Sequence, residues 1–138
     1  MLFRSMEAVN KLLYKPFFVK NVVTRGMQRG RWLGFPTANL EFQDKKITPN
    51  FGAYVGYTII GNEKYPSIAN VGMRPTFADT EKPLTEVNIL GFNKNLYDQT
   101  IEFQFIKQLR KEIKFSSPEA LCEQIVMDKK QALAFLKK

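Results

Sequence analysis

Hydrophobic and polar residues alternate along the middle of the chain with the two-residue period of β-strands. The alternation is clearest at 100–106, where three apolar residues alternate with polar ones. Four further segments are rich in aromatic and β-branched residues, at 17–23, 53–60, 65–71 and 84–92. The Gly61-Asn62 pair between two of them is typical of a hairpin turn. The pattern predicts five or six short strands in an antiparallel barrel or sandwich.

Both ends of the chain carry the three-to-four-residue spacing of amphipathic helices. Apolar residues follow this spacing over 2–13. Near the other end, Ser117 is expected to cap a helix from about Pro118 to Leu136. Its apolar stripe consists of Leu121, Cys122, Ile125, Ala132, Leu133 and Leu136. We therefore expect a mainly-β fold, with a carboxy-terminal helix packed on its outside and a short amino-terminal helix.

The composition limits the kinds of partner and of catalytic or metal site that the chain can have. The chain has 138 residues, enough for one domain, and a formal net charge of +8, which favours an anionic partner. It has no histidine and only Cys122, so an internal disulfide and a thiolate zinc site are excluded. Acid–base chemistry must fall to carboxylates, lysine or tyrosine. The sequence has no apolar run of membrane-spanning length and no secretory signal, which predicts a cytoplasmic protein.

The segment 26–39 combines glycines with arginines. Glycines let backbone amides approach an anion closely, and arginines bind phosphate through charge-assisted hydrogen bonds, but a flexible basic loop has the same composition. Thr37 and Asn39 point to one side if this end of the segment is extended. Their neutral oxygens suit Mg²⁺ when phosphates and water complete the shell. On spacing alone, a strand start with a polar turn is the favoured explanation of the pair.

Glu86 is the strongest candidate for a general base. It shares a strand face with apolar residues, an environment that suits such a role, although a glutamate at the end of a strand facing water fits the pattern as well. The segment 109–115 mixes cations with an aromatic residue, as a solvated connection or a lid over an aromatic anion would. The segment 70–77 is interpreted as a turn-rich loop.

Five segments together resemble the riboflavin kinase family, which includes the carboxy-terminal module of bacterial bifunctional FAD synthetases. They are GRWLGFPTANL at 30–40, GAYVGYTI at 52–59, IANVGMRPTF at 68–77, TEVNILGF at 85–92 and LRKEIKF at 109–115. They occur in the family's order and cover nearly everything from Phe17 to Phe135. The PTAN segment preceded by GR-x-LG is the most specific of them.

The resemblance implies a six-stranded Greek-key barrel over 16–138, with 1–15 as a linker. It also implies transfer of the γ-phosphate of Mg-ATP to the ribityl 5′-hydroxyl of riboflavin, giving FMN and ADP. The family's catalytic base corresponds to Glu86. The remaining roles implied are Mg²⁺ and phosphate ligands at Thr37 and Asn39, an ATP flap containing Gly26 and Arg31, and a flavin flap containing Arg110, Ile113 and Phe115.

The chain also departs from the family pattern. Asn21, Asn88 and Gly91 stand where a glycine, a histidine and an aspartate are common. The adenylyltransferase module of the bifunctional enzymes is not among these residues, so we expect this chain not to make FAD. Two alternatives remain at this stage. One is a catalytically weak flavin- or nucleotide-binding module, and the other is a basic barrel that binds single-stranded nucleic acid. The kinase interpretation predicts neither a nucleic-acid partner nor a membrane.

Overall fold

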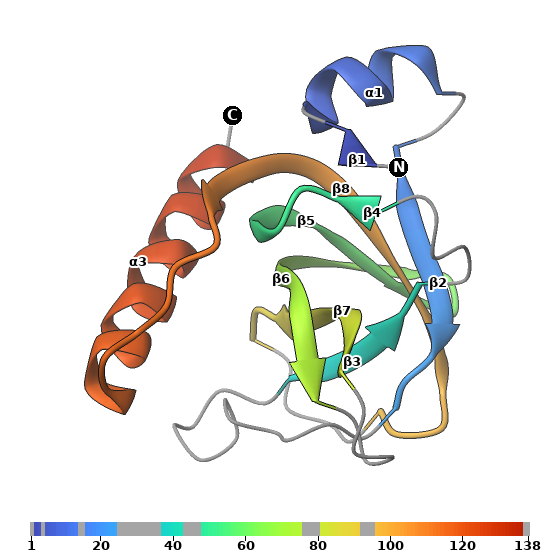
Figure 1. Ribbon diagram of the computed structural model, residues 1–138. Coiled ribbons are helices and arrows are strands. Elements are labelled where there is room, and N and C mark those ends of the chain that lie inside the picture. Colours follow the sequence, from blue (N-terminus) through green and yellow to red (C-terminus); the bar gives the residue numbers. More distant parts are fainter. Residues whose placement is uncertain are drawn as a thin grey trace.

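The computed structural model describes residues 2–3, 5–13, 16–24, 37–42, 48–75, 81–91 and 96–136 (Figure 1). Two helices are present in these ranges, α1 (Met6–Leu12) and α3 (Pro118–Leu136). The strands are β1 (Leu2–Phe3), β2 (Phe18–Val22), β3 (Ala38–Glu41), β4 (Thr48–Pro49), β5 (Gly52–Ile60), β6 (Glu63–Pro75), β7 (Glu81–Ile89) and β8 (Thr100–Lys111). None of the helices in the described ranges is both long enough and apolar enough to cross a membrane.

Six strands form one antiparallel sheet in the order β2-β8-β5-β6-β7-β3. The strands β5, β6 and β7 follow one another, and β8 returns to lie beside β5, which is a Greek key. The sheet curls until its two edge strands meet. The backbone N–H of Thr24 donates to the carbonyl of Asn39 (2.9 Å), and the Asn21 amide donates to the carbonyl of Glu41 (3.1 Å). The predicted six-stranded barrel is therefore confirmed.

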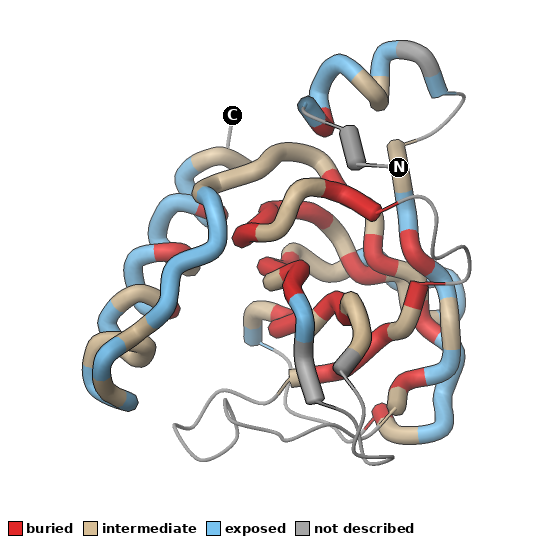
Figure 2. Tube along the Cα trace, viewed as in Figure 1, coloured by how far each residue is buried: buried red, intermediate tan, exposed pale blue. Residues whose placement is uncertain are grey.

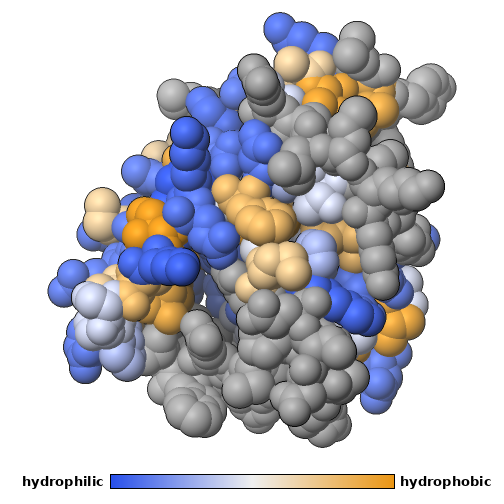
Figure 3. All heavy atoms as spheres, in the orientation of Figure 1, coloured by the Kyte–Doolittle hydropathy of each residue, from blue (hydrophilic) through white to orange (hydrophobic). Residues whose placement is uncertain are grey.

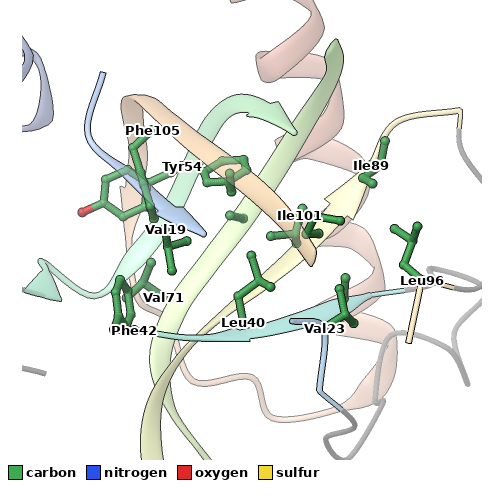
Figure 4. Close-up of a cluster of buried hydrophobic side chains, with 14 of the residues drawn as sticks. Val19, Val23, Leu40, Phe42, Tyr54, Val71, Ile89, Leu96, Ile101 and Phe105 are labelled. Atoms are coloured by element: carbon green, nitrogen blue, oxygen red, sulfur yellow. The ribbon is translucent and has the colours of Figure 1, made fainter. Parts of the chain in front are cut away.

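The barrel interior is packed with apolar side chains from every strand of the sheet (Figure 4). The buried residues along the strands are red in Figure 2. Phe103 and Phe105 on β8 are fully buried, as the alternation at 100–106 predicted. The ring of Phe105 meets the rings of Tyr54 and Phe103 edge-on, with centroids 5.1 and 4.8 Å apart. Edge-to-face contacts of this kind add to the stabilisation that comes from burying the rings.

The helix α3 packs against the outside of the barrel (Figure 1). It begins as predicted, because the hydroxyl of Ser117 accepts a hydrogen bond from the N–H of Ala120 (3.1 Å). A second apolar cluster joins it to the sheet and contains Val55, Ile68, Ile125 and Ala132. The predicted stripe is wrong in one position, since Leu133 is 44% exposed.

Some predicted boundaries are wrong. The helix expected over 2–13 is confined to Met6–Leu12, because Leu2–Phe3 pairs in parallel with Thr48–Pro49. The turn-rich loop expected at 70–77 is strand through Pro75, the last residue of β6. Pairing with β7, from Leu84 to Glu81, keeps this end of β6 in strand conformation although it contains a glycine and a proline.

Two further strands differ from their predicted extents. The strand expected at 84–92 is shifted, since β7 runs from Glu81 to Ile89. The strand expected at 100–106 continues to Lys111, because β5 pairs with β8 from Glu102 to Lys111. The pairing includes a register shift between Ala53 and Tyr54. The start of the predicted flavin flap is therefore strand.

Candidate functional site

The strand register places four polar residues in one line across the sheet. Asn39 is opposite Glu86 in the β3–β7 pair, and Glu86 is opposite Asn70 in the β6–β7 pair. Asn70 is opposite Ala53, which in turn is opposite Arg110 on β8. Directly opposed residues of antiparallel strands project to the same face. We call Asn39, Glu86, Asn70 and Arg110 the polar row.

The polar row lies on the outer face of the barrel, the face on which α3 packs. The neighbours of Glu86 along β7, Thr85 and Val87, are both fully or almost fully buried, and Val87 belongs to the interior cluster. Strand alternation therefore directs Glu86 outward. Its partly exposed side chain shares this face with Asn88, which is 7% exposed. The apolar residue Leu84, two positions before Glu86 on β7, lies on the same face and is buried.

Thr37 and Asn39 stand at one end of the row. Asn39 is only 3% exposed although it lies on the outward face of β3. The hydroxyl oxygen of Thr37 is buried and has no hydrogen-bond partner within the described ranges. An orphaned buried hydroxyl is costly unless a ligand satisfies it. These neutral oxygens fit Mg²⁺ bound together with phosphate. The described residues contain no cluster of three metal-binding acids, cysteines or histidines.

Arg110 stands at the other end of the row and is held on several sides. Its Nε and Nη2 donate to the two carboxylate oxygens of Asp128 on α3, at 3.0 and 2.9 Å. Its Nη1 donates to the backbone carbonyl of Lys111 (3.2 Å). Its Nη2 also lies 3.5 Å from Oδ1 of Asn70, the long limit for a hydrogen bond. The guanidinium therefore bridges β8, β6 and α3.

The remaining residues of the predicted flavin flap follow β8. The Cζ atom of Arg110 lies 5.8 Å from the ring centre of Phe115, within cation–π range. Phe115 is partly buried, whereas Ile113 is 45% exposed. Both residues follow Arg110 within five positions of the chain and offer apolar surface at this end of the row.

Not every predicted site residue can be placed. Gly26 and Arg31, predicted for the ATP flap, lie outside the described residues. Two of the departures from the family pattern have structural explanations. Asn21 ties β2 to β3, as described above, and Gly91 has a φ of 72°, a left-handed conformation that favours glycine.

Sequence reasoning missed two residues of this arrangement. Asn70 was assigned to a turn-rich segment and given no role, because its partners come from β7 and β8. Asp128 is completely buried on α3. Its sequence signal was a lone acid three residues after Ile125 and four before Ala132, within the apolar stripe.

On the face shown in Figure 3, the described residues include hydrophobic ones in separate groups and hydrophilic ones between some of them. The fold and the polar row together define the class of this protein. It is a small Greek-key barrel that carries one carboxylate between two amides on its outer face, with an ion-paired arginine at the end of the row.

The family model for riboflavin kinase, or flavokinase, matches residues 13–136, and the chain belongs to that family. It is 38% identical over 133 residues to a bifunctional riboflavin kinase/FMN adenylyltransferase of Bacillus subtilis. That match covers 95% of this chain and 42% of the relative. A similar protein of Buchnera aphidicola is 40% identical over 126 residues, 90% of this chain and 40% of the relative. The chain thus spans about two fifths of the length of these relatives.

Solved structures share the fold. A riboflavin kinase from Trypanosoma brucei is 25% identical, with a TM-score of 0.62, over 91% of this chain and 82% of that one. A Streptococcus pneumoniae structure titled a macrolide-efflux protein is 35% identical, with a TM-score of 0.79. That match covers 91% of this chain and 41% of the other. The predicted family and its barrel are confirmed.

Proposed function

We propose that this chain is a riboflavin kinase, which transfers the γ-phosphate of ATP to the ribityl 5′-hydroxyl of riboflavin and forms FMN and ADP. The observation that carries the proposal is the pairing of Asn39 with Glu86 on one sheet face, in a chain of the flavokinase family. Its relatives from bacteria and its structural neighbour from a trypanosome bear the same kinase name.

In this proposal the two ends of the polar row bind different substrates. Thr37 and Asn39 bind the phosphates of ATP, since both present neutral oxygen ligands at the buried end of the row. Bound there, Mg²⁺ supplies neutralisation of the negative charge on the phosphates. Gly26 and Arg31 complete the ATP site through backbone N–H groups and a guanidinium. Ile113 and Phe115, with Arg110, cover the flavin through apolar and aromatic surface.

Glu86 is the general base between these two ends. Its carboxylate accepts a hydrogen bond from the ribityl 5′-hydroxyl and takes the proton as that oxygen attacks the γ-phosphorus. The neighbouring amides of Asn39 and Asn70 lie on the same sheet face and limit the orientations open to the carboxylate. Positioning and electrostatic stabilisation supply most of the acceleration in phosphoryl transfer, so the rigid sheet suits this chemistry.

The domain assignment follows the same proposal. Residues 16–138 form the kinase module, and 1–15 form the linker that precedes it. The linker helix contacts the barrel, because Asn10 donates to the carbonyl of Phe105 (2.8 Å) and accepts from the N–H of Phe17 (2.8 Å). These contacts hold α1 against the barrel.

The test is direct. The purified chain is incubated with riboflavin, ATP and Mg²⁺, and the flavins are separated by chromatography. We expect FMN and ADP in equal amounts. No FMN above the no-enzyme control would remove the kinase assignment. Tight flavin binding without turnover would instead support the weak binding module. Salt-sensitive binding of single-stranded oligonucleotides, without flavin binding, would support the nucleic-acid alternative, which the comparisons do not favour.

A further inference from the structure

The helix α3 carries a carboxylate where an apolar residue is expected. The side chain of Asp128 is 0% exposed, and its neighbours in the stripe, Ile125 and Ala132, pack against the barrel. Asp128 accepts hydrogen bonds from Arg110 through both oxygens and from the Gln124 amide at 3.0 Å. Removing an ion from water is costly, and a bidentate ion pair with a further hydrogen bond offsets that cost.

The Arg110 guanidinium also approaches the proposed general base, Glu86, by way of Asn70. From Asp128, Arg110 extends to Asn70, the residue opposite Glu86, and its Cζ atom lies 5.8 Å from the ring centre of Phe115. The strand between Arg110 and Asn70 carries Ala53 at this level of the sheet. A side chain of one methyl group leaves room for the guanidinium to span that strand.

We propose that Asp128 is a positioning residue for phosphoryl transfer, acting through Arg110 on Phe115 of the flavin flap and on Asn70 beside Glu86. This inference rests on the proposed kinase function. Two apolar residues in place of the pair would hold α3 on the barrel as well, and often better. Only the bidentate pair fixes the direction of the guanidinium plane, on which the contacts with Asn70 and Phe115 depend.

The experiment compares Asp128→Asn with a matched control, Ile125→Ala. Asp128→Asn removes a buried charge from α3 and Ile125→Ala removes a buried apolar side chain from the same helix, but Ile125 belongs to the apolar cluster and not to the Arg110 contacts. Two measurements are made on each folded variant, below its melting temperature. The first is steady-state kinetics with riboflavin and Mg-ATP varied separately. The second is hydrogen exchange of backbone amides at 110–116.

We expect Asp128→Asn to lower kcat/KM for riboflavin by about 10- to 100-fold, since small misplacements of positioning groups cost this much. The KM for Mg-ATP should stay within about twofold, because that substrate binds at the opposite end of the row. Amides at 110–116 should exchange faster. Ile125→Ala should lower the melting temperature and leave the kinetics at the parent values.

Identical kinetics and exchange in Asp128→Asn and Ile125→Ala would overturn the inference and leave a purely structural ion pair. If Asp128→Asn does not fold, the double variant Arg110→Met/Asp128→Leu replaces the pair with apolar residues that can stay packed. A folded double variant with parent kinetics would likewise overturn it. If the parent itself makes no FMN, the kinase proposal fails. The exchange measurement then still decides whether Asp128 orders the flap.

Discussion

Asn39 on β3 and Glu86 on β7 lie directly opposite each other across an antiparallel strand pair, although long stretches of chain separate them in the sequence. Their Cα register brings an amide from the PTAN segment beside the only acidic residue of the polar row. In the proposed kinase, this pair is where the phosphates meet the hydroxyl that attacks them.

The carboxylate of Glu86 is tested by Glu86→Gln, which keeps the size of the side chain but cannot accept the proton. We expect turnover to fall by about 10²- to 10⁴-fold, the usual contribution of a positioned general base. Riboflavin and Mg-ATP binding should remain nearly unchanged. Steady-state kinetics on the folded variant measure this, with thermal melts as the control. Turnover within a few-fold of the parent would take Glu86 out of the base role.

The amide of Asn39 is tested by Asn39→Ala. In the proposed kinase this side chain stands at the nucleotide end of the row, so its loss should weaken Mg-ATP binding far more than riboflavin binding. Calorimetric titration with each ligand separately gives both affinities. Equal losses for the two ligands would contradict the assignment and indicate a general disturbance of β3.

The hydroxyl of Thr37 offers a cleaner test, because the described residues provide it with no hydrogen-bond partner. Thr37→Val keeps the shape and removes only that oxygen. Stability should be unchanged or slightly higher, since an unsatisfied buried polar atom is lost. Mg-ATP affinity should fall. Urea unfolding measures the stability, and calorimetric titration measures the Mg-ATP affinity. A marked loss of stability would show that the Thr37 hydroxyl has a hydrogen-bond partner within the protein.

The close approach of β5 and β8 is tested at Gly56. A Cβ atom there would collide with the backbone carbonyl of Gln104 and lie 2.8 Å from the Phe103 ring. We expect Gly56→Ala to destabilise the fold by about 1–3 kcal/mol, as overpacking does. The control is Gly61→Asn in the β5–β6 turn, where a Cβ meets nothing within 4 Å and asparagine tolerates the φ of +60°. Equal urea midpoints for the two variants would contradict this account.

Alkaline pH should weaken the fold through Tyr54. Burial raises the pKa of the Tyr54 phenol from 10.0 to about 12, and its hydroxyl donates to the carbonyl of Asn50 (2.6 Å). The unfolded phenol releases its proton near its ordinary pKa while the folded one retains it. The contribution of the protonated Tyr54 phenol to the free energy of unfolding is therefore complete below about pH 10. It is lost as pH rises towards about 12.

The comparison is the free energy of unfolding of the parent and of Tyr54→Phe from about pH 8 to 11. The parent curve should fall more steeply than that of Tyr54→Phe above about pH 10. Lysines titrate in the same range in both proteins, so only the difference between the curves reports Tyr54. Parallel curves would show that the phenol titrates alike in the folded and unfolded states.

Local signals in the sequence were enough for most elements. The alternation around Phe103 and the cap at Ser117 depend on neighbours within a few residues, so a strand and a helix could be predicted there. The matching segments identified the family for the same reason, since they are contiguous. Glu86 could be singled out as a candidate because it stands among apolar residues on one strand.

The tertiary structure decided what those residues touch. Register between distant strands set Glu86 between Asn39 and Asn70, and no local pattern encodes a pairing of that kind. Pairing with β7 also turned the glycine- and proline-containing end of β6 into strand, against its local preference. The burial of Asp128 likewise depends on tertiary packing, here of α3 on the barrel. A helix pattern indicates which face of α3 is buried. Only the packed barrel brings Arg110 to that face, where it forms an ion pair with Asp128.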